Sequence, residues 1–124
     1  MPVRSFNSVV LKWPRREEAL AAARAWARGL CADPAVEAVY CVGSCARGDY
    51  GVGSDVDLVV IVRASDLPPV QRYVRFSPND LPVPFDLWVL TRAEWERMAE
   101  VSPLLRRKID QEKLDLLNEE AVPG

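Results

Sequence analysis

The chain has 124 residues, of which 49% are hydrophobic and 27% charged, as expected for one globular domain. Its formal net charge is −2, which argues against general nucleic-acid binding, because such proteins usually carry a basic face. The sequence has no histidine, and its three cysteines lack metal-ligand spacing, so His-based triads, zinc sites and disulfide frameworks are disfavoured.

The sequence carries no sign of a membrane or secretory segment. No run of about 18 apolar residues occurs, and the first 16 residues lack the long apolar core of a signal peptide. We therefore expect a cytoplasmic protein without membrane contact. We expect residues 1–124 to form a single domain, with residues 1–13 as an N-terminal extension.

The first half of the chain predicts a helix, a strand and a short helical turn. Residues 8–13 are ambiguous between a strand and an extended arm. Pro14 suits a first helical turn, and residues 15–32 are rich in the helix formers Ala, Glu, Arg and Leu. Residues 36–42 are β-branched and aromatic, which predicts a strand. It runs into Gly43 and a segment that we interpret as a short helical turn and a loop.

The second half begins with the clearest strand, over residues 55–62. Its unbroken apolar end is typical of a central strand buried on both faces. A proline-rich loop follows over residues 64–82, with a short helix or turn near residues 70–74. Residues 83–90 predict a third strand.

Two helices are expected towards the C-terminus. Thr91 and Glu94 match a capping box, so a helix should begin there and run to about Glu100. A further helix should begin at Pro103. Residues 113–117 either extend that helix or form an edge strand. These elements predict an α/β (α+β) fold with a small mixed β-sheet flanked by helices.

Carboxylates stand at the start of the clearest strand. Asp55 and Asp57 are two residues apart, so in a strand they point to the same face, roughly 7 Å apart at the backbone. Charges there are costly unless compensated, and Mg²⁺ prefers carboxylate and phosphate oxygens. Asp86 lies in the third strand and lines up beside Asp57 if the two strands pair. Three such carboxylates can hold two metal ions about 3.5–4 Å apart.

The alternatives are structural. Asp55 and Asp57 then only cap a turn, and Asp86 is an exposed residue on a strand face.

A glycine-serine pair precedes Asp55 by a gap of ten residues. Gly43 lets the backbone approach a phosphate closely, and the Ser44 hydroxyl can donate to a terminal phosphate, or it only caps the short helix. Arg47, one turn later, pairs either with phosphate or with a carboxylate in a structural ion pair. Ser54 is more typical of a turn or capping residue than of a catalytic group.

Other reactive or aromatic residues favour structural roles. Cys45 stands at a helix start, which suits a thiolate, but the chain has no histidine to act as its base, so we expect it to pack. We expect Cys31 and Cys41 in the core and Trp88 as a core anchor. For Trp95 the sequence leaves two predictions open: a place in the core or a place on a partner-binding surface.

One segment resembles a known signature. The string GSCARGDYGVGSDVDLVVIV, residues 43–62, resembles that of the DNA polymerase β-like nucleotidyltransferase superfamily, and within it the minimal nucleotidyltransferases of bacteria and archaea. Their pattern is Gly-Ser, ten residues and Asp-x-Asp, often with Ala-Arg-Gly after the serine and a serine before the first Asp. Residues 46–48 and Ser54 match. The family's later strand Asp, in an x-Asp-Leu-x context, is matched by residues 85–87.

The resemblance implies a site as well as a fold. It implies two Mg²⁺ ions and an NTP donor, most often ATP. The expected catalytic and metal-binding residues are Asp55, Asp57 and Asp86, and the expected nucleotide-binding residues are Gly43, Ser44, Arg47 and Ser54.

The resemblance also suggests partners. Many relatives are antitoxins encoded beside a helical HEPN toxin, and some adenylylate a toxin tyrosine. The leading hypothesis is therefore Mg²⁺-dependent transfer of AMP from ATP to a hydroxyl acceptor, with a HEPN-type protein as a candidate acceptor.

Two other hypotheses remain. The chain is an antitoxin-like binding module that neutralises a HEPN-type partner by contact, or it modifies a small hydroxyl compound beside a separate helical protein. The N-terminal extension and the Pro-rich residues 64–84 depart from common relatives, which leaves the acceptor open. The nucleobase preference and homo-oligomerisation are open as well.

Overall fold

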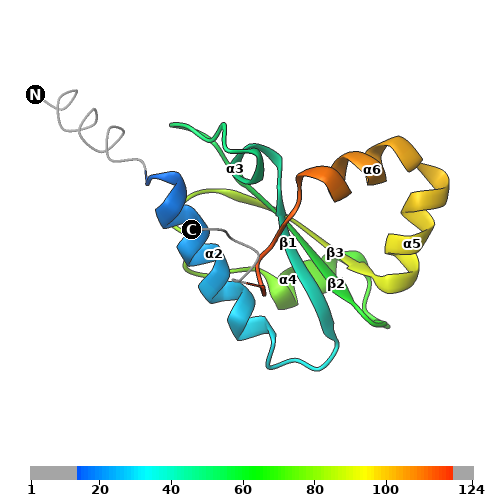
Figure 1. Cartoon of the computed structure of the whole chain (residues 1–124). Coiled ribbons are helices and arrows are strands. Elements are labelled where there is room, and N and C mark those ends of the chain that lie inside the picture. The colour runs from blue at the N-terminus through cyan, green and yellow to red at the C-terminus, as the bar shows by residue number, and fades with distance from the viewer. Residues whose placement is uncertain (1–13, 119–124) are drawn as a thin grey trace, which may run out of the picture.

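A four-stranded mixed sheet with helices on both faces forms the molecule (Figure 1). The computed structural model describes residues 14–118, so the predicted N-terminal extension lies outside the described residues. The strands are β1 (Val36–Val42), β2 (Val56–Val62), β3 (Phe85–Thr91) and β4 (Leu114–Asp115). The helices of the described range are α2 (Arg16–Leu30), α3 (Gly43–Arg47), α4 (Pro69–Phe76), α5 (Arg92–Val101) and α6 (Pro103–Glu112).

The strand order in the sheet is β3-β2-β1-β4. β1 and β2 are antiparallel and joined through α3, whereas β2 and β3 are parallel and joined through α4. The short β4 pairs antiparallel with β1, so residues 113–117 form an edge strand rather than a helical extension. The predicted mixed sheet is confirmed, and β2 is the central strand between β3 and β1.

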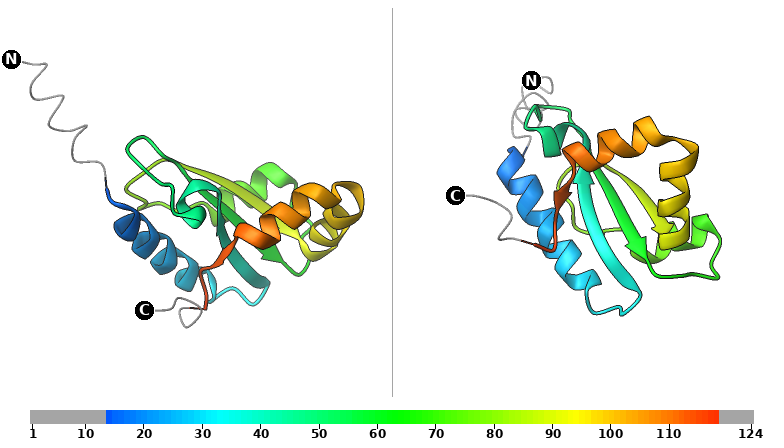
Figure 2. Two further views of the ribbon diagram at one scale, coloured as in Figure 1. Left: turned by 45° about the horizontal axis from the view of Figure 1, so that its top comes forward. Right: turned by 45° about the vertical axis from the view of Figure 1, so that its right-hand side comes forward.

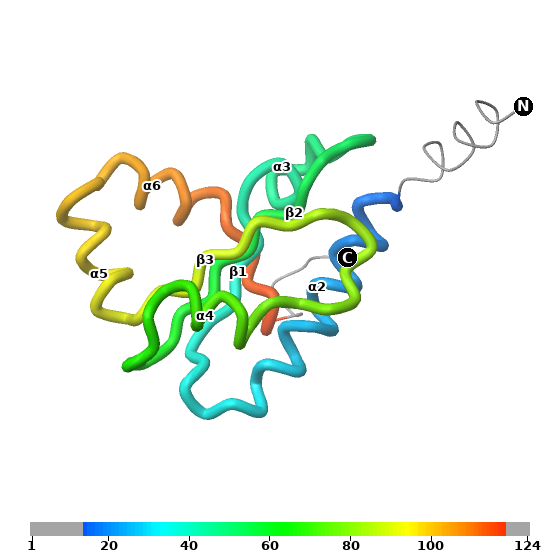
Figure 3. The backbone as a smooth tube through the Cα atoms, turned by 180° about the vertical axis from the view of Figure 1, so that it is seen from behind, coloured from blue at the N-terminus to red at the C-terminus, as the bar shows by residue number. Residues whose placement is uncertain are grey.

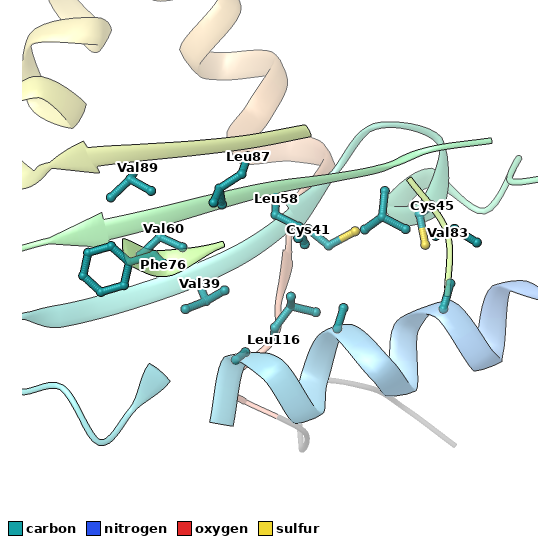
Figure 4. Packing of buried hydrophobic residues seen from close by; sticks show 14 of the residues in the cluster. Val39, Cys41, Cys45, Leu58, Val60, Phe76, Val83, Leu87, Val89 and Leu116 are labelled. Atoms are coloured by element: carbon teal, nitrogen blue, oxygen red, sulfur yellow. The ribbon is translucent and has the colours of Figure 1, made fainter. Parts of the chain in front are cut away.

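The larger core lies between the sheet and the helices α2 and α4. Three alanines of α2 at a spacing of four residues lie on one side of the helix and are fully buried: Ala19, Ala23 and Ala27. They belong to the same buried cluster as Leu58 and Leu116, which are labelled in Figure 4. Trp26 of α2 donates through Nε1 to the carbonyl of Phe76 in α4 at 3.0 Å. Seen from behind, α4 lies beside β3 (Figure 3).

The other face of the sheet lies under α5 and α6, which arch over it (Figure 2). Val59 and Ile61 of β2 pack against the buried Trp95 of α5, so Trp95 belongs to the core. Arg106 of α6 lies over the Trp95 ring at 3.7 Å and donates to the Trp95 carbonyl at 2.6 Å. The capping box of Thr91 and Glu94 is present at the start of α5, as predicted.

Two core assignments are wrong. Trp88 is 49% exposed, because it lies on the edge strand β3 while the buried cluster under α5 centres on β2. Cys31 is exposed because α2 ends at Leu30 and the chain leaves the helix in a turn. Among residues 14–118, no helix has the length and apolar character needed to cross a bilayer.

Candidate active site

The paired starts of β2 and β3 bring two carboxylates together. Asp57 and Asp86 are direct partners in the parallel register, so their side chains point to the same face of the sheet. Asp57 is half-buried and Asp86 is exposed. The prediction that Asp86 lines up beside Asp57 is therefore confirmed.

Asp55 lies just before β2 and is exposed, two residues from Asp57. Burial raises the pKa of Asp57, and the negative charges of Asp86 and Asp55 raise that pKa further, whereas Arg47 lowers it. Negative charge thus accumulates where β2 begins. A cation at this position would relieve the repulsion and favour the ionised form of Asp57.

Gly43 lies beside Asp57 on the β1 side, whereas Asp86 lies beside it on the β3 side. Its neighbour Val42 is the β1 partner of Asp57, and Gly43 itself turns the chain into α3 with φ +77°. A Cβ on Gly43 would lie 3.2 Å from Cγ of Asp57 and would collide with Oδ2. Glycine is therefore required here by both the backbone conformation and the contact with the carboxylate. Sequence reasoning expected close approach at Gly43 but did not identify Asp57 as the group that approaches.

The other candidate phosphate-binding residues lie on α3, beside the carboxylates. Ser44 is the second residue of α3 and is half-buried. Arg47, at the end of α3, forms an ion pair with Glu112 of α6 at 2.7 Å and a longer one with Asp49 at 3.5 Å. The structure thus contains the structural ion pair considered for Arg47. The positive charge of Arg47 also lowers the pKa of Asp57.

Ser54 closes the turn before Asp55. Its hydroxyl accepts a hydrogen bond from the Gly51 N–H at 3.0 Å, and its own N–H donates to the Gly51 carbonyl at 3.0 Å. These two bonds stabilise the turn that precedes Asp55 and the start of β2. The structure supports the turn role of Ser54.

A cavity of about 390 Å³ lies between the sheet and the two covering helices, beside Asp57 and Gly43. Its walls are largely apolar and come from β2, β3, α5 and α6: Val59, Trp88, Leu90, Trp95, Met98, Leu105 and Ile109. Asp57, Lys108 and the Arg47–Glu112 pair supply its charged groups. Sequence reasoning missed this cavity, because its walls lie far apart in the chain.

The donor set fits a divalent cation, although its side chains are not gathered around one point. Within residues 14–118, no group of three or more Asp, Glu or Cys side chains is arranged to hold a metal ion. Neighbouring ionised carboxylates repel one another when no cation lies between them. The paired register of Asp57 and Asp86, the nearby Asp55 and the raised pKa of Asp57 fit Mg²⁺, which prefers carboxylate oxygens.

Two buried thiols lie on the core side of the same region. Cys41 of β1 and Cys45 of α3 are both fully buried. Hydrogen bonding to Cys45 and then burial raise the pKa of the Cys41 thiol well above its ordinary range. A thiol in this state is a poor nucleophile. Both cysteines pack in the core, as predicted for Cys41 and favoured for Cys45.

Comparisons with known proteins agree with this fold. A family model described as "Nucleotidyltransferase domain" matches residues 24–116. Among solved structures, a protein from Sulfolobus solfataricus, provisionally assigned as a nucleotidyltransferase, superposes with a TM-score of 0.58 at 24% identity, covering 85% of each chain. At that identity the likeness establishes the fold alone. A comparison with curated protein sequences found no match.

Proposed function

The chain belongs to the nucleotidyltransferase domain family, and from this premise we propose that it is a Mg²⁺-dependent enzyme that transfers AMP from ATP to a hydroxyl acceptor. Membership of the family supports nucleotide transfer in general. The observation that carries the more specific proposal is the direct pairing of Asp57 with Asp86, with Gly43 held against Asp57.

The three carboxylates have different surroundings, which suit different roles. Asp55 and Asp57 would hold the metal ions, since they are close in the chain and Asp57 is half-buried. Asp86 is exposed, so it can meet an incoming acceptor and take the proton from its hydroxyl. Bound Mg²⁺ would supply charge neutralisation for the triphosphate and for the departing pyrophosphate.

The segment at the start of α3 would hold the β- and γ-phosphates. Gly43 has no side chain to obstruct them, and Ser44 offers a hydroxyl donor. Arg47 adds positive charge on the same segment and is oriented by Glu112. Positioning and charge stabilisation are the main contributions that a protein makes to such a transfer.

We further propose a helical protein of HEPN type as the acceptor. The corner between α5 and α6 exposes three large apolar side chains, with exposed fractions of 69% for Val101, 78% for Leu104 and 50% for Leu105. Leu105 also lines the cavity beside Asp57. Exposed apolar side chains of this kind are typical of a protein contact, and Leu105 connects them to the cavity that Asp57 also lines.

The test is transfer from ATP labelled at the α-phosphate, with Mg²⁺ and a host extract as the source of acceptor. Asp57→Asn should abolish labelling and leave the fold intact, because asparagine has nearly the same shape. Asp66→Asn, which alters an exposed loop carboxylate, is the matched control and should label normally. Full labelling by a folded Asp57→Asn protein would overturn the proposed mechanism.

A second candidate function is neutralisation of a HEPN-type partner by contact, with little or no transfer. The exposed apolar corner of α5 and α6 favours it, because such contact needs no catalytic group. This function requires that the complex survive the double substitution of Asp55 and Asp57 by asparagine and be lost in Leu104→Asp. The opposite pattern excludes it.

A further inference from the structure

The five-residue helix α3 depends on its neighbours for its position. A helix this short is not stable alone, so tertiary contacts must hold it. Its first residue, Gly43, packs against the Asp57 carboxylate. Any contact that moves α3 therefore also changes how Gly43 and Asp57 face one another.

Arg16, near the start of α2, bonds to the far end of α3. The last carbonyls of a helix have no partner inside it. In α3 the Ser44 carbonyl accepts from the Gly48 N–H at 3.0 Å. The next two carbonyls accept from one guanidinium: Arg16 Nε donates to Cys45 at 2.6 Å, and Arg16 Nη2 donates to Ala46 at 3.4 Å.

Two further contacts hold α3 and the loop that follows it. The Tyr50 hydroxyl donates to the Pro14 carbonyl, just before α2, at 3.0 Å. On the other side, Arg47 pairs with Glu112 of α6 at 2.7 Å. Figure 2 shows α3 lying between the start of α2 and the end of α6. The start of α2 thus contacts both α3 and the following loop.

We propose that Arg16 is a positioning residue: acting through α3, and supported by the Pro14–Tyr50 bond, it fixes Gly43 against Asp57. This inference rests on the proposed function for its effect on nucleotide binding. Arg16 lies outside residues 24–116, which the family model matches, so the family pattern does not assign it this role. The guanidinium is suited to the task because its fork of donors reaches two carbonyls at once.

The experiment compares Arg16→Leu with wild type by two measurements. The first is amide hydrogen exchange of residues 44–49 in the free protein, and the second is the Kd for ATP with Mg²⁺. Arg16→Leu should speed exchange of the Gly48 and Asp49 amides, leave β2 protected and weaken ATP binding about tenfold. Arg16→Lys, which keeps the charge and some donors, should restore part of both.

Arg63→Leu is the matched control. Arg63 follows the opposite end of β2 from Asp57, and its side chain is 70% exposed, so its loss should change neither measurement. If Arg16→Leu does not fold, Tyr50→Phe removes one hydroxyl and should speed exchange only in residues 44–50. Wild-type exchange in a folded Arg16→Leu protein, or equally faster exchange in every element, overturns the proposal, as does wild-type exchange in Tyr50→Phe.

The two measurements separate this inference from the function on which it rests. Faster exchange at Gly48 and Asp49 in Arg16→Leu, with no ATP binding by wild type, supports the positioning role and contradicts the nucleotidyltransferase proposal. Magnesium-dependent ATP binding that is equally tight in wild type and Arg16→Leu contradicts the positioning role and leaves the proposed function standing.

Discussion

Gly43 is the residue on which the geometry of the site depends most directly. Its positive φ places the chain in a conformation that side chains disfavour, and the space where a side chain would begin is taken by Asp57. Glycine is thus required both by the local backbone conformation and by the tertiary contact with Asp57. A substitution should therefore affect the stability of the fold and the position of the carboxylate together.

We predict that Gly43→Ala lowers the free energy of unfolding by about 1–3 kcal/mol, because it adds backbone strain and a collision with Asp57. It should also weaken Mg²⁺-dependent ATP binding. Gly29→Ala is the matched control: a Cβ added to Gly29 in α2 would meet no atom of another part of the chain within 4 Å, so alanine should stabilise the helix by up to about 1 kcal/mol. Urea unfolding measures both, and equal effects of the two substitutions would contradict this account.

Asp57 should lower the stability of the metal-free protein. Burial raises its pKa, and the charges of Asp86 and Asp55 add to that effect, so its ionised form is disfavoured in the folded state. The stability that its protonated form contributes is present below the ordinary Asp pKa and is lost as the pH rises through the raised value.

Asp57→Asn should therefore raise the free energy of unfolding at pH 7, in the presence of a chelator, by a few tenths of a kcal/mol and at most about 1 kcal/mol. The gain should shrink as the pH falls and Asp57 in the wild type becomes protonated. Thermal unfolding at several pH values measures it. A variant that is less stable than wild type at pH 7 would show that Asp57 is not under electrostatic strain.

At the residue scale, the sequence predicted the position of the candidate site carboxylates better than it predicted the exposure and the partners of individual side chains. Asp86 was expected beside Asp57 if their two strands paired, with support from the resemblance, and the parallel register confirms that position. The exposure of Trp88 was not predictable, because it depends on which strand forms the edge of the sheet. The Glu112 partner of Arg47 lies 65 residues away, so no local pattern could indicate it.

At the scale of elements, a buried arginine joins α4 to β3 and α5. Arg72 is only 5% exposed, and a buried charge needs partners. It donates to the carbonyls of Leu67 at 3.0 Å and Val89 at 2.9 Å, and to both carboxylate oxygens of Glu94 at 2.7 and 3.1 Å. Glu94 also completes the capping box of α5, so one carboxylate serves two elements.

Glu94→Gln separates these two roles, because glutamine keeps the capping box and loses the charge. We expect a loss of about 1–2 kcal/mol at pH 7, discounted for the exposure of Glu94 and for the bonds that Arg72 keeps. The hydrogen bond from Arg72 holds the pKa of Glu94 below its usual range. The loss should therefore be present above the ordinary Glu pKa and disappear as the pH falls through the lowered value.

Urea unfolding across this pH range measures the difference, with Glu96→Gln as the control. Glu96 is exposed and 3.7 Å from Arg92, so its substitution should change stability by less than about 0.5 kcal/mol. A pH-independent effect of Glu94→Gln would mean that its role is packing rather than charge pairing.

The order of elements was predictable because each has a local signal. The strand expected over residues 36–42 has those bounds, and the helix expected over residues 15–32 is Arg16–Leu30. The short helix α4 was expected only loosely, near residues 70–74, because prolines surround it. The capping box identified Glu94, but nothing local indicated Arg72, which lies 22 residues away.

At the scale of the whole molecule, the sheet order decides where the site forms. Placing β2 between β3 and β1 puts Asp57 between Asp86 and Val42, beside Gly43. The mixed sheet was expected from the element pattern and from the resemblance. The position of β4 against β1 and the cavity under α5 and α6 depend on long-range packing, which no periodicity encodes.

The central claim is that the three carboxylates hold a metal-dependent nucleotide site. The most direct test is calorimetric titration of ATP into the protein with and without Mg²⁺, repeated with Asp55→Asn. We predict binding by wild type only in the presence of Mg²⁺, and no binding by Asp55→Asn in either condition. Equal binding by the wild type and the variant, or no binding by the wild type with Mg²⁺, would contradict the account.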